Sequence, residues 1–443
     1  MNQSKRISKY VRRYTIENLD VLYCMSSERV LVLTPELSTL FMSNKNDVDR
    51  LKDIHPQFYN RLVDGDFLIE CDKQELNCVL DKWKQEDINP DYIKLIINPT
   101  LQCNLSCWYC YENHGNKTFM DENVVKATMN YIRNLFEENP DTNLIVSFFG
   151  GEPLLYFNRV IEPIITFAQN EARKHSKNVG IAFTTNGTLL TDNICAFLKG
   201  TNAPVSFQIT LDGSKVNHNK TRFFKNGVGS YDIVTANIRK AVSYGFSVNV
   251  RFNYTNKNYS DCLAIMDEFN AIDETDKKLI DFSFHKVWQE DSSPEMEESI
   301  RQAHKQYLNG GFEATVNDGI SAGRCYADAA NNVVINYDGL VYKCTARDFT
   351  PENAEGLLSE NGTISWNEKG ALREQLKFGH QICHECPIFP ICHNGCSQDK
   401  LEQPSDIDSC PRGFPDNQKE TIAINHATSL LINHLTDGKY KHL

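Results

Sequence analysis

The sequence NPTLQCNLSCWYCYE, residues 98–112, decides the fold of the middle of this chain. It holds three cysteines in a C-x3-C-x2-C pattern, at Cys103, Cys107 and Cys110. It directly follows the apolar run at residues 93–97, which is typical of a buried strand. Three thiolates this close together in a loop can turn to one side and bind a soft metal centre. The stretch therefore predicts a metal site at the end of a strand.

Zinc ions and iron-sulfur clusters differ in the ligands that they need. A structural zinc ion takes four protein ligands, and the nearest other sulfurs, Cys78 and Cys195, lie before the strand and far downstream. A cubane cluster needs one ligand per iron, so three cysteines leave one iron open to a small molecule. The triplet therefore favours a catalytic cluster. The alternatives are a zinc knuckle that uses His114 and a group of buried thiols.

Composition limits the class of protein. The 443 residues are enough for about three domains, and 41% hydrophobic with 23% charged residues is typical of a soluble globular protein. The sequence has no apolar run of membrane-spanning length and no apolar signal segment after its basic start, so we expect a cytoplasmic protein without a membrane partner. The net charge of -12 argues against a nucleic-acid partner. Fifteen cysteines, ten of them in short metal-type spacings, indicate metal rather than disulfides in a reducing compartment.

Residues 1–91 predict a small α+β domain. Two short strands, Val21 to Cys24 and Arg29 to Leu33, flank a polar turn and indicate a hairpin. Three short helical segments at residues 35–63, a strand at residues 67–71 and a linker helix at residues 76–87 follow. This layout is common in peptide-binding and winged-helix modules. A plain structural extension is the alternative.

Residues 92–317 alternate between strand and helix patterns. The alternation predicts an α/β fold, a partial (β/α)6 TIM-like barrel whose chemistry lies at the carboxyl ends of its strands. Polar turns follow the second, third and fourth strands, at Gly150-Gly151-Glu152-Pro153, Thr185-Asn186-Gly187 and Asp212-Gly213. The expected strands lie at residues 93–97, 144–149, 179–184, 205–211, 247–254 and 279–285.

The strand ends offer groups that suit an amino acid. Gly150 and Gly151 let a ligand approach the backbone, and Glu152 offers a carboxylate to a cationic amine. Thr210 and Arg222 could hold a carboxylate, the arginine through its planar fork. The alternatives are a tight turn and a solvated surface charge. Together with an open iron, these groups indicate a site for an amino acid that chelates iron.

At this point the chain resembles the radical S-adenosylmethionine (SAM) superfamily, in which an aromatic residue, here Tyr109, precedes the last cysteine of the triplet. The resemblance implies that the triplet holds a 4Fe-4S cluster and that the amine and carboxylate of SAM chelate its open iron. It also implies that the turn from Gly150 to Pro153 contacts the amine and that Asn186 binds the cofactor.

A second stretch carries the resemblance further. The sequence TLDGSKVNHNKTR, residues 210–222, is similar to the S-[IL]-D-G-x4-H-D-x2-R stretch of the peptide- and protein-modifying branch. By this match Thr210 stands in the place of the usual serine, and Arg222 binds the carboxylate of SAM. Asn219 replaces the usual aspartate.

Residues 318–415 carry the other seven cysteines that fall into motifs. Their spacing resembles the SPASM extension, which binds two auxiliary iron-sulfur clusters, and a structural zinc ribbon is the alternative. The resemblance assigns four cysteines to one cluster, Cys383, Cys386, Cys392 and Cys410. It assigns three to the other without an obvious fourth sulfur, Cys325, Cys344 and Cys396. Residues 333–344 indicate a hairpin that turns at Asp338-Gly339, and residues 416–443 a closing helix.

The resemblance also implies a function. The enzyme would cleave SAM reductively and abstract a hydrogen atom from a ribosomally synthesised precursor peptide, which the N-terminal domain binds, to form a thioether or carbon-carbon crosslink. A flavodoxin or ferredoxin would supply the electron. His285, at the end of the sixth strand, could donate a proton or contact adenine, or it could be a core histidine.

Two alternatives remain. One is an anaerobic sulfatase maturase that oxidises a cysteine or serine side chain. Such enzymes usually have an aspartate after the second auxiliary cysteine, where this chain has Thr345. The other is a non-enzymatic iron-sulfur adaptor or electron carrier, which would have no use for the Gly150 to Pro153 turn and Arg222.

Overall fold

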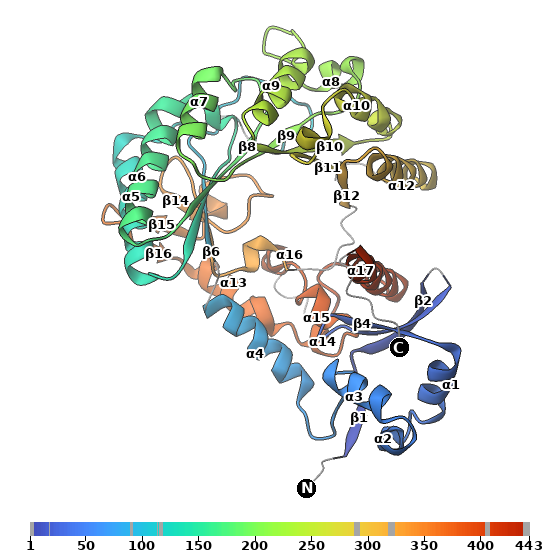
Figure 1. Cartoon of the computed structure of the whole chain (residues 1–443). Coiled ribbons are helices and arrows are strands. Elements are labelled where there is room, and N and C mark those ends of the chain that lie inside the picture. The colour runs from blue at the N-terminus through green and yellow to red at the C-terminus, as the bar shows by residue number, and fades with distance from the viewer. Residues whose placement is uncertain are drawn as a thin grey trace. The chain divides into compact units, whose positions relative to one another are not determined.

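The computed structural model describes residues 4–16, 18–88, 92–112, 114, 118–287, 293–317, 324–403 and 408–436. The chain forms two compact units (Figure 1). The central unit consists of Pro90–Gly319 and Ala330–Ala371, and the terminal unit consists of Met1–Asn89, Ile320–Ala329 and Leu372–Leu443. Each unit combines separate stretches of the chain, and the consecutive domains at 1–91, 92–317, 318–415 and 416–443 stay a prediction. No helix in the described ranges has the length and apolarity needed to cross a membrane.

The central unit is built on one large mixed sheet. Its described strands pair in the order β12-β11-β10-β9-β8-β7-β6-β13-β14-β15-β16. The pairings from β12 to β13 are parallel, and those from β13 to β16 are antiparallel. The strands are β6 (Tyr92–Ile97), β7 (Asn143–Phe148), β8 (Val179–Thr185), β9 (Val205–Thr210), β10 (Ser247–Tyr254), β11 (Ile280–Lys286), β12 (Glu313–Asn317), β13 (Asn332–Ile335), β14 (Leu340–Tyr342), β15 (Gly356–Leu358) and β16 (Ile364–Trp366).

The six strands expected from the sequence are confirmed within one or two residues at each end. The structure adds β12 beside β11, and it pairs β13 with β6, so the predicted 333–344 hairpin extends the central sheet. Gly339 has a positive φ of 81°, as its place in the hairpin turn requires. The α/β class is therefore confirmed, whereas closure into a partial barrel stays a prediction.

Helices follow one another along one side of this sheet (Figure 1). Asp121 caps the first of them by accepting hydrogen bonds from the amides of Asn123 and Val124. The inward stripes of the helices and the apolar faces of the strands form one hydrophobic core. The helices are α5 (Glu122–Glu138), α6 (Glu162–Lys174), α7 (Asp192–Gly200), α8 (Lys215–Thr221), α9 (Tyr231–Ser243), α10 (Cys262–Phe269), α11 (Glu274–Lys277) and α12 (Pro294–Asn309).

The face of β9 that points away from the helices is polar. Along β9 the side chains of Val205, Phe207 and Ile209 are buried, whereas those between them are exposed or half-buried. Parallel strands that are covered on both faces are usually apolar throughout. The alternation therefore indicates that helices cover one face, and that the opposite face is available for polar chemistry at the carboxyl ends of the strands.

The terminal unit contains two small antiparallel sheets. β2 (Val11–Ile16), β3 (Leu19–Cys24) and β4 (Arg29–Leu33) pair in that order, and β1 (Lys5–Ile7) pairs with β5 (Leu68–Glu70). The predicted hairpin is confirmed as β3 and β4, whereas the sequence analysis missed β1 and β2. The expected helical segments correspond to α1 (Pro35–Ser43), α2 (Leu51–Ile54), α3 (Pro56–Asp64) and α4 (Glu75–Ile88).

The two ends of the chain share a core in this unit. Tyr10 and Tyr23, near and on the N-terminal sheet, belong to the same buried cluster as Trp83 of α4, Cys383 and Ala427. Trp83 is 2% exposed and packs against the rings of Phe378, Phe389 and His393. The N-terminal strands are therefore part of the core around the C-terminal cysteine region. The C-terminal helices are α13 (Glu368–Gly379), which starts in the central unit, α14 (Gln381–His384), α15 (Phe389–Cys392), α16 (Ser397–Glu402) and α17 (Asp416–Thr436), the expected closing helix.

Candidate active site

The cysteine loop leaves β6 and lies against the glycine turn that follows β7. The amide of Gly151 donates to the carbonyl of Thr100 at 3.1 Å, and the amide of Glu152 donates to Gln102 at 2.8 Å. A Cβ atom on Gly151 would lie 2.3 Å from the Gln102 carbonyl oxygen, and Gly150 has a φ of 101°. The glycines are thus needed for close packing of the turn against the cysteine loop, a reason that the sequence did not reveal.

Glu152 joins this turn to the one that follows β8. Its carboxylate is fully buried and accepts hydrogen bonds from the amides of Leu154 and Asn186, at 3.0 and 2.8 Å, and from the Thr185 hydroxyl. Burial raises the pKa of Glu152, although the hydrogen bonds from Asn186 and Thr185 oppose that shift. The predicted contact of Glu152 with a cofactor amine stays a prediction.

Asn186 carries this connection on to the first cysteine. Its side-chain amide donates to Asn104 Oδ1 at 2.8 Å and lies 3.7 Å from Cys103 Sγ. The Oδ1 atom of Asn186 accepts from the amide of Thr188 at 2.9 Å, which fixes the orientation of the side chain. The strand-end residues therefore hold the cysteine loop in place.

Burial and neighbouring acidic groups affect the thiols of the loop. Burial raises the pKa of Cys103 to about 12, and neighbouring Cys107 adds to the rise. Burial likewise raises the pKa of Cys107, to which Cys110 contributes. Cys110 Sγ lies 3.3 Å from Nε2 of His114, whose Nδ1 contacts the Leu101 carbonyl. The binding of a cluster by these three cysteines stays a prediction.

Tyr109 and Arg222 meet at the carboxyl ends of β9 and β10. The Tyr109 hydroxyl donates to Asp212 at 2.5 Å, and it accepts from Arg222 Nη1 at 2.7 Å and from the Asn253 side chain at 3.1 Å. Burial raises the pKa of the Tyr109 phenol, which therefore keeps its proton and remains a donor. The sequence analysis named Tyr109 and Arg222 but did not foresee that they touch, and it missed Asn253.

Arg222 is a buried cation, and its guanidinium has hydrogen-bond partners at only some of its nitrogens within the described residues. Its side chain lies 3.7 Å from the Asp212 carboxylate. Burial by itself lowers the pKa of Arg222, but the acidic groups of Tyr109, Cys107 and Asp212 outweigh that effect, and the net shift is upward. Within the described residues, its Nε is buried and has no hydrogen-bond partner. A buried donor without a partner is costly, so this edge of the guanidinium suits a carboxylate ligand.

A buried histidine fixes the backbone behind Arg222. His218 Nδ1 accepts from the Asp212 amide at 3.1 Å, and Nε2 contacts the Ser230 hydroxyl at 2.9 Å. That hydroxyl in turn donates to the Arg222 carbonyl at 2.9 Å. Burial, with a contribution from Arg222, lowers the pKa of His218 to about 3, so the ring is neutral. One tautomer, with the proton on Nε2, satisfies the whole chain of hydrogen bonds.

The remaining strand-end residues lie on the polar face. Thr210 is the register partner of Arg251, and His285 is the partner of Asn253. Arg251 Nε donates to Asn253 Oδ1 at 2.8 Å. Burial and the charge of Arg251 lower the pKa of His285 to about 3, which makes it a neutral ring rather than a ready proton donor at neutral pH.

Glu112 is a further residue that the sequence analysis did not single out. Its side chain is 9% exposed and, among the described residues, one carboxylate oxygen has no hydrogen-bond partner. Burial raises the pKa of Glu112 to about 7. A glutamate two residues after a cluster cysteine has no sequence signal that distinguishes it from a surface carboxylate.

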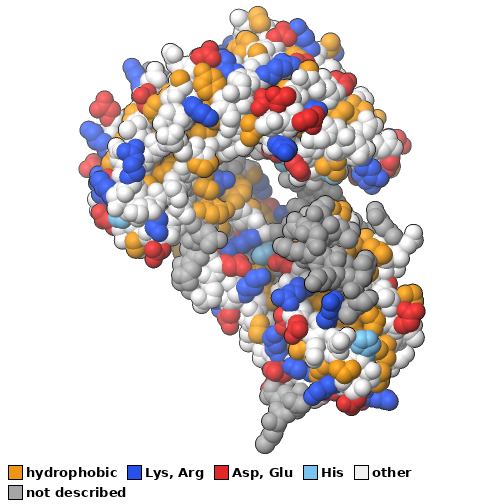
Figure 2. All heavy atoms as spheres, viewed as in Figure 1, with side chains coloured by type: hydrophobic (Ala, Val, Ile, Leu, Met, Phe, Trp, Pro, Cys, Tyr) orange, Lys and Arg blue, Asp and Glu red, His pale blue; other side chains and the backbone are white. Residues whose placement is uncertain are grey.

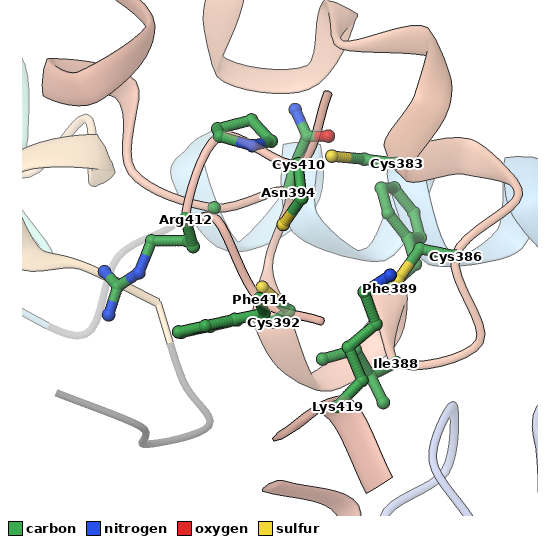
Figure 3. A pocket seen from close by; sticks show the side chains of 12 residues that line it. Cys383, Cys386, Ile388, Phe389, Cys392, Asn394, Cys410, Arg412, Phe414 and Lys419 are labelled. Atoms are coloured by element: carbon green, nitrogen blue, oxygen red, sulfur yellow. The ribbon is translucent and has the colours of Figure 1, made fainter. Parts of the chain in front are cut away.

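Four cysteines of the terminal unit surround one pocket. The sulfur atoms of Cys383, Cys386, Cys392 and Cys410 lie around the same space, with Lys419 beside it (Figure 3). Burial raises the pKa of Cys383 to about 12 and that of Cys392 to about 11. The four residues that the sequence grouped are therefore neighbours in space, and the donor set fits a four-iron cluster.

The other predicted group divides between the two units. Cys325 and Cys396 belong to the terminal unit and Cys344 to the central unit. In the terminal unit, Asp328 accepts a hydrogen bond from Ser397 and is 6% exposed. The shared cluster at these three cysteines stays a prediction.

A site for a single metal ion needs all its ligands around one atom. In the ranges that the structure describes, no three His, Cys, Asp or Glu side chains are placed to hold one metal ion. This finding concerns zinc-type sites, in which all ligands converge on one atom. The thiolates of a cubane bind different irons and need not converge in this way.

The family model described as the Radical SAM superfamily matches residues 97–269. These residues form a radical SAM domain. The radical SAM domain begins at the end of β6 and ends with α10, so it contains the cysteine loop, Glu152, Asn186 and Arg222. Proteins of this superfamily use SAM and a 4Fe-4S cluster, and the C-terminal cysteine-rich region of the chain fits auxiliary clusters.

Two relatives extend the comparison. An uncharacterized protein of Methanocaldococcus jannaschii is 33% identical over 175 residues, which are 40% of this chain and 56% of that protein. The chain thus spans about half the length of that relative. A cysteine-type anaerobic sulfatase-maturating enzyme of Clostridium novyi is 24% identical over 350 residues, 70% of this chain and 88% of that enzyme.

Two solved structures share the fold. The enzyme anSMEcpe, with bound AdoMet and the Cp18Cys peptide, has a TM-score of 0.59 and 20% identity and covers 78% of this chain and 99% of its own. Streptococcus suis SuiB, bound to the precursor peptide SuiA, has a TM-score of 0.53 and 15% identity and covers 94% of this chain and 100% of its own. At these identities the likeness concerns the fold alone.

Proposed function

We propose that the chain is a radical SAM/SPASM peptide maturase, which cleaves SAM reductively and abstracts a hydrogen atom from a ribosomally synthesised precursor peptide to form a thioether or carbon-carbon crosslink. The observation that carries this proposal is the unpartnered Nε of the buried Arg222, next to the cysteine loop of a radical SAM domain. A non-enzymatic electron carrier needs no such buried cation.

The residues at the strand ends have separate roles in this proposal. When bound, the cluster and SAM supply one-electron cleavage and a radical that abstracts hydrogen. Cys103, Cys107 and Cys110 would hold the cluster, and Arg222 would bind the carboxylate of SAM through its unpartnered edge. Glu152 and Asn186 keep the cysteine loop in position through their hydrogen bonds.

The polar face next to this site is the proposed substrate surface. Arg251, His285 and Asn253 lie in register on β10 and β11, one or two strands from Thr210. Their donors and acceptors suit the backbone amides of a peptide. Asp212, buried and held by Tyr109, lies at the same strand ends.

The architecture of the terminal unit favours a peptide over a small molecule as the substrate. It combines the three-stranded sheet β2-β3-β4 with short helices, a layout that can accept a leader segment as an added strand. The SuiB structure, which holds a precursor peptide, covers 94% of this chain. Cys383, Cys386, Cys392 and Cys410 would hold one auxiliary cluster. The three cysteines Cys325, Cys344 and Cys396 would hold the other.

The test uses the full chain, reconstituted with iron and sulfide without oxygen. With SAM and dithionite, the protein should produce 5'-deoxyadenosine. With a precursor peptide encoded by a neighbouring gene, it should also produce a peptide that has lost one H2, as a crosslink requires. An absence of 5'-deoxyadenosine from protein with full iron content would refute the enzymatic proposal.

A second candidate is an anaerobic sulfatase-maturase type of activity, which oxidises a cysteine or serine side chain. The alignment with the Clostridium novyi enzyme over 88% of its length favours it. A hydrazide reagent that reacts with aldehydes separates the two candidates, because it labels an oxidised side chain and leaves a crosslinked peptide unlabelled. Labelled product with unlabelled starting peptide would favour this second activity.

A further inference from the structure

Arg251 is a cation on β10 that has no carboxylate partner among the described residues. Val250 and Phe252, on either side of it, belong to the hydrophobic core, so the Arg251 side chain points to the face of β10 opposite the helices. Its Nε donates to Asn253 Oδ1 at 2.8 Å. Within the described part of the chain, its two terminal nitrogens make no hydrogen bond and no ion pair. Most of the N–H donors of this guanidinium are therefore available to a ligand.

Two carboxylates on neighbouring strands have other partners. Asp212, which follows β9, lies 3.7 Å from Arg222. Asp281, on β11, accepts a hydrogen bond from the side-chain amide of Asn249. Burial lowers the pKa of Arg251, and acidic groups such as Asp212 oppose this shift without outweighing it. A half-buried charge without a counter-charge is costly, so we expect an anion from outside the chain to supply one.

Cations on the outer surface of the central unit are placed differently. There, Lys and Arg side chains are interspersed with Asp and Glu side chains (Figure 2). Arg301 of α12 pairs with Glu298 at 2.7 Å, and Arg239 of α9 pairs with Glu268. Water also solvates these surface side chains, whereas Arg251 is half-buried. Arg251 therefore lacks the counter-charge that even these more exposed arginines have.

The residues around Arg251 connect it to the cysteine loop on one side and to β11 on the other. Asn253, which accepts from Arg251, donates to the Tyr109 hydroxyl at 3.1 Å. His285 of β11 is the register partner of Asn253. Burial and the charge of Arg251 lower the pKa of His285 to about 3, so the ring is neutral and keeps one N–H donor. A carboxylate beside Arg251 could therefore accept from both side chains, close to the cysteine loop.

We propose that Arg251, beside His285, binds a carboxylate of the precursor peptide. The inference rests on the proposed function, because it makes this carboxylate the feature by which the sheet face recognises its substrate. A planar guanidinium matches the two oxygens of a carboxylate, whereas a neutral amide offers it one acceptor. The carboxylate of SAM has its own partner in the proposed function, Arg222, so Arg251 remains for the peptide. The group belongs to an acidic side chain or to the C-terminus of the peptide.

The probes are three mixtures of N-acetylated heptapeptides with random neutral residues around a fixed central one. The first mixture has a central glutamate and a C-terminal amide. The second has a central glutamine and a C-terminal amide, and the third has a central glutamine and a free C-terminus. The full chain, reconstituted with its clusters and supplied with SAM, is equilibrated with the mixtures without oxygen. Mass spectrometry then measures the peptides that a filter retains with the protein.

The wild type should retain a mixture that carries a carboxylate about tenfold or more over the glutamine amide mixture, because charge-assisted hydrogen bonds replace neutral ones. Preference for the glutamate mixture identifies a side-chain carboxylate, and preference for the free C-terminus identifies the terminal one. Arg251→Gln should lose the preference. Arg251→Lys should keep part of it, because the charge remains without the planar fork. The control Arg301→Gln changes an exposed arginine on α12 and should keep the wild-type preference.

A second measurement tests whether the chain leaves Arg251 without a counter-charge. The melting temperature of peptide-free Arg251→Gln should not fall below that of the wild type, because the substitution removes an uncompensated cation. A fall of several degrees would mean that the chain itself neutralises Arg251, which would contradict the proposal.

The retention assay gives clear contrary results. Equal retention of the three mixtures by the wild type, at any level, would overturn the proposal. So would a preference that persists in Arg251→Gln while the Kd of SAM rises, because Arg251 would then belong to the cofactor site. Retention needs no turnover, so the inference fails separately from the proposed function, which fails if the wild type makes no 5'-deoxyadenosine with dithionite.

Discussion

Replacement of Tyr109 by phenylalanine tests whether the cysteine loop positions Arg222. The change removes one hydroxyl group and keeps the ring that precedes Cys110. That hydroxyl makes three hydrogen bonds, to Asp212 at 2.5 Å, to Arg222 at 2.7 Å and to Asn253 at 3.1 Å. We therefore expect the guanidinium of Arg222 to lose its fixed orientation.

The size of the effect follows from these contacts. A hydrogen bond to a charged group contributes about 1.5–3 kcal/mol, and two of the three bonds join Tyr109 to the ions Asp212 and Arg222. Those ions are already 3.7 Å apart, so they can move together and recover part of the loss. A net weakening of SAM binding by about 1–2 kcal/mol is expected, which is roughly a five- to thirtyfold increase in Kd.

The assay is calorimetric titration of SAM into reconstituted protein without oxygen, with Kd expressed for cluster-loaded protein. Tyr111→Phe is the matched control, because the Tyr111 hydroxyl donates to the Thr345 carbonyl rather than to Arg222. Iron content and melting temperature of the two variants should match those of the wild type. A Kd for Tyr109→Phe within twofold of the wild-type value would refute the positioning role.

Three further predictions concern the triplet cysteines, Gly151 and His218. Changing all three triplet cysteines to alanine should remove about a third of about twelve irons and abolish SAM cleavage. An iron assay and the yield of 5'-deoxyadenosine measure the two effects. Cleavage that persists would refute the assignment of the triplet as the ligands of the catalytic cluster. Gly151→Ala should lower SAM cleavage by up to about a hundredfold, because its Cβ would lie 2.3 Å from the Gln102 carbonyl and displace the loop, whereas Gly200→Ala, with no atom within 4 Å, should retain wild-type activity. Burial lowers the pKa of His218 from 6.5 to about 3, so the unfolded chain binds this proton first as pH falls, and the free energy of unfolding should decline between those pH values. In His218→Asn, the free energy of unfolding measured with denaturant should fall less steeply with pH, by up to about 1.4 kcal/mol per pH unit. Equal slopes in the wild type and the variant would contradict this.

The secondary structure of the central unit could be predicted well from sequence. β10 at residues 247–254 has the expected bounds, because strand alternation is a property of neighbouring residues. β12 was missed because the run Glu313–Asn317 is short, has an exposed charge at its start and carries only two small apolar residues, Ala314 and Val316. β2 was missed because two arginines interrupt its apolar pattern.

The contacts of the candidate site residues were harder to predict than their places at the strand ends. Close approach of a ligand to Gly151 stays a prediction, and the structure adds a second reason for the glycine, since a Cβ there would lie 2.3 Å from the Gln102 carbonyl oxygen. The contact of Glu152 with an amine stays a prediction, and the sequence did not show that its carboxylate also accepts hydrogen bonds from Thr185 and Asn186. A motif in the sequence identifies the residue type, but it does not show which of its possible partners lies beside it.

The sequence by itself determined the parts of this protein that depend on short range: the cysteine triplet within eight residues, the polar turns at the strand ends and the hairpin at Asp338-Gly339. Tertiary structure alone decided that Tyr109 meets Arg222, which is 113 residues away, and that Tyr10 and Cys383 share a core. The physical reason is that periodicity fixes which face of a strand is buried, whereas strand order and register fix which distant side chains come within hydrogen-bonding distance.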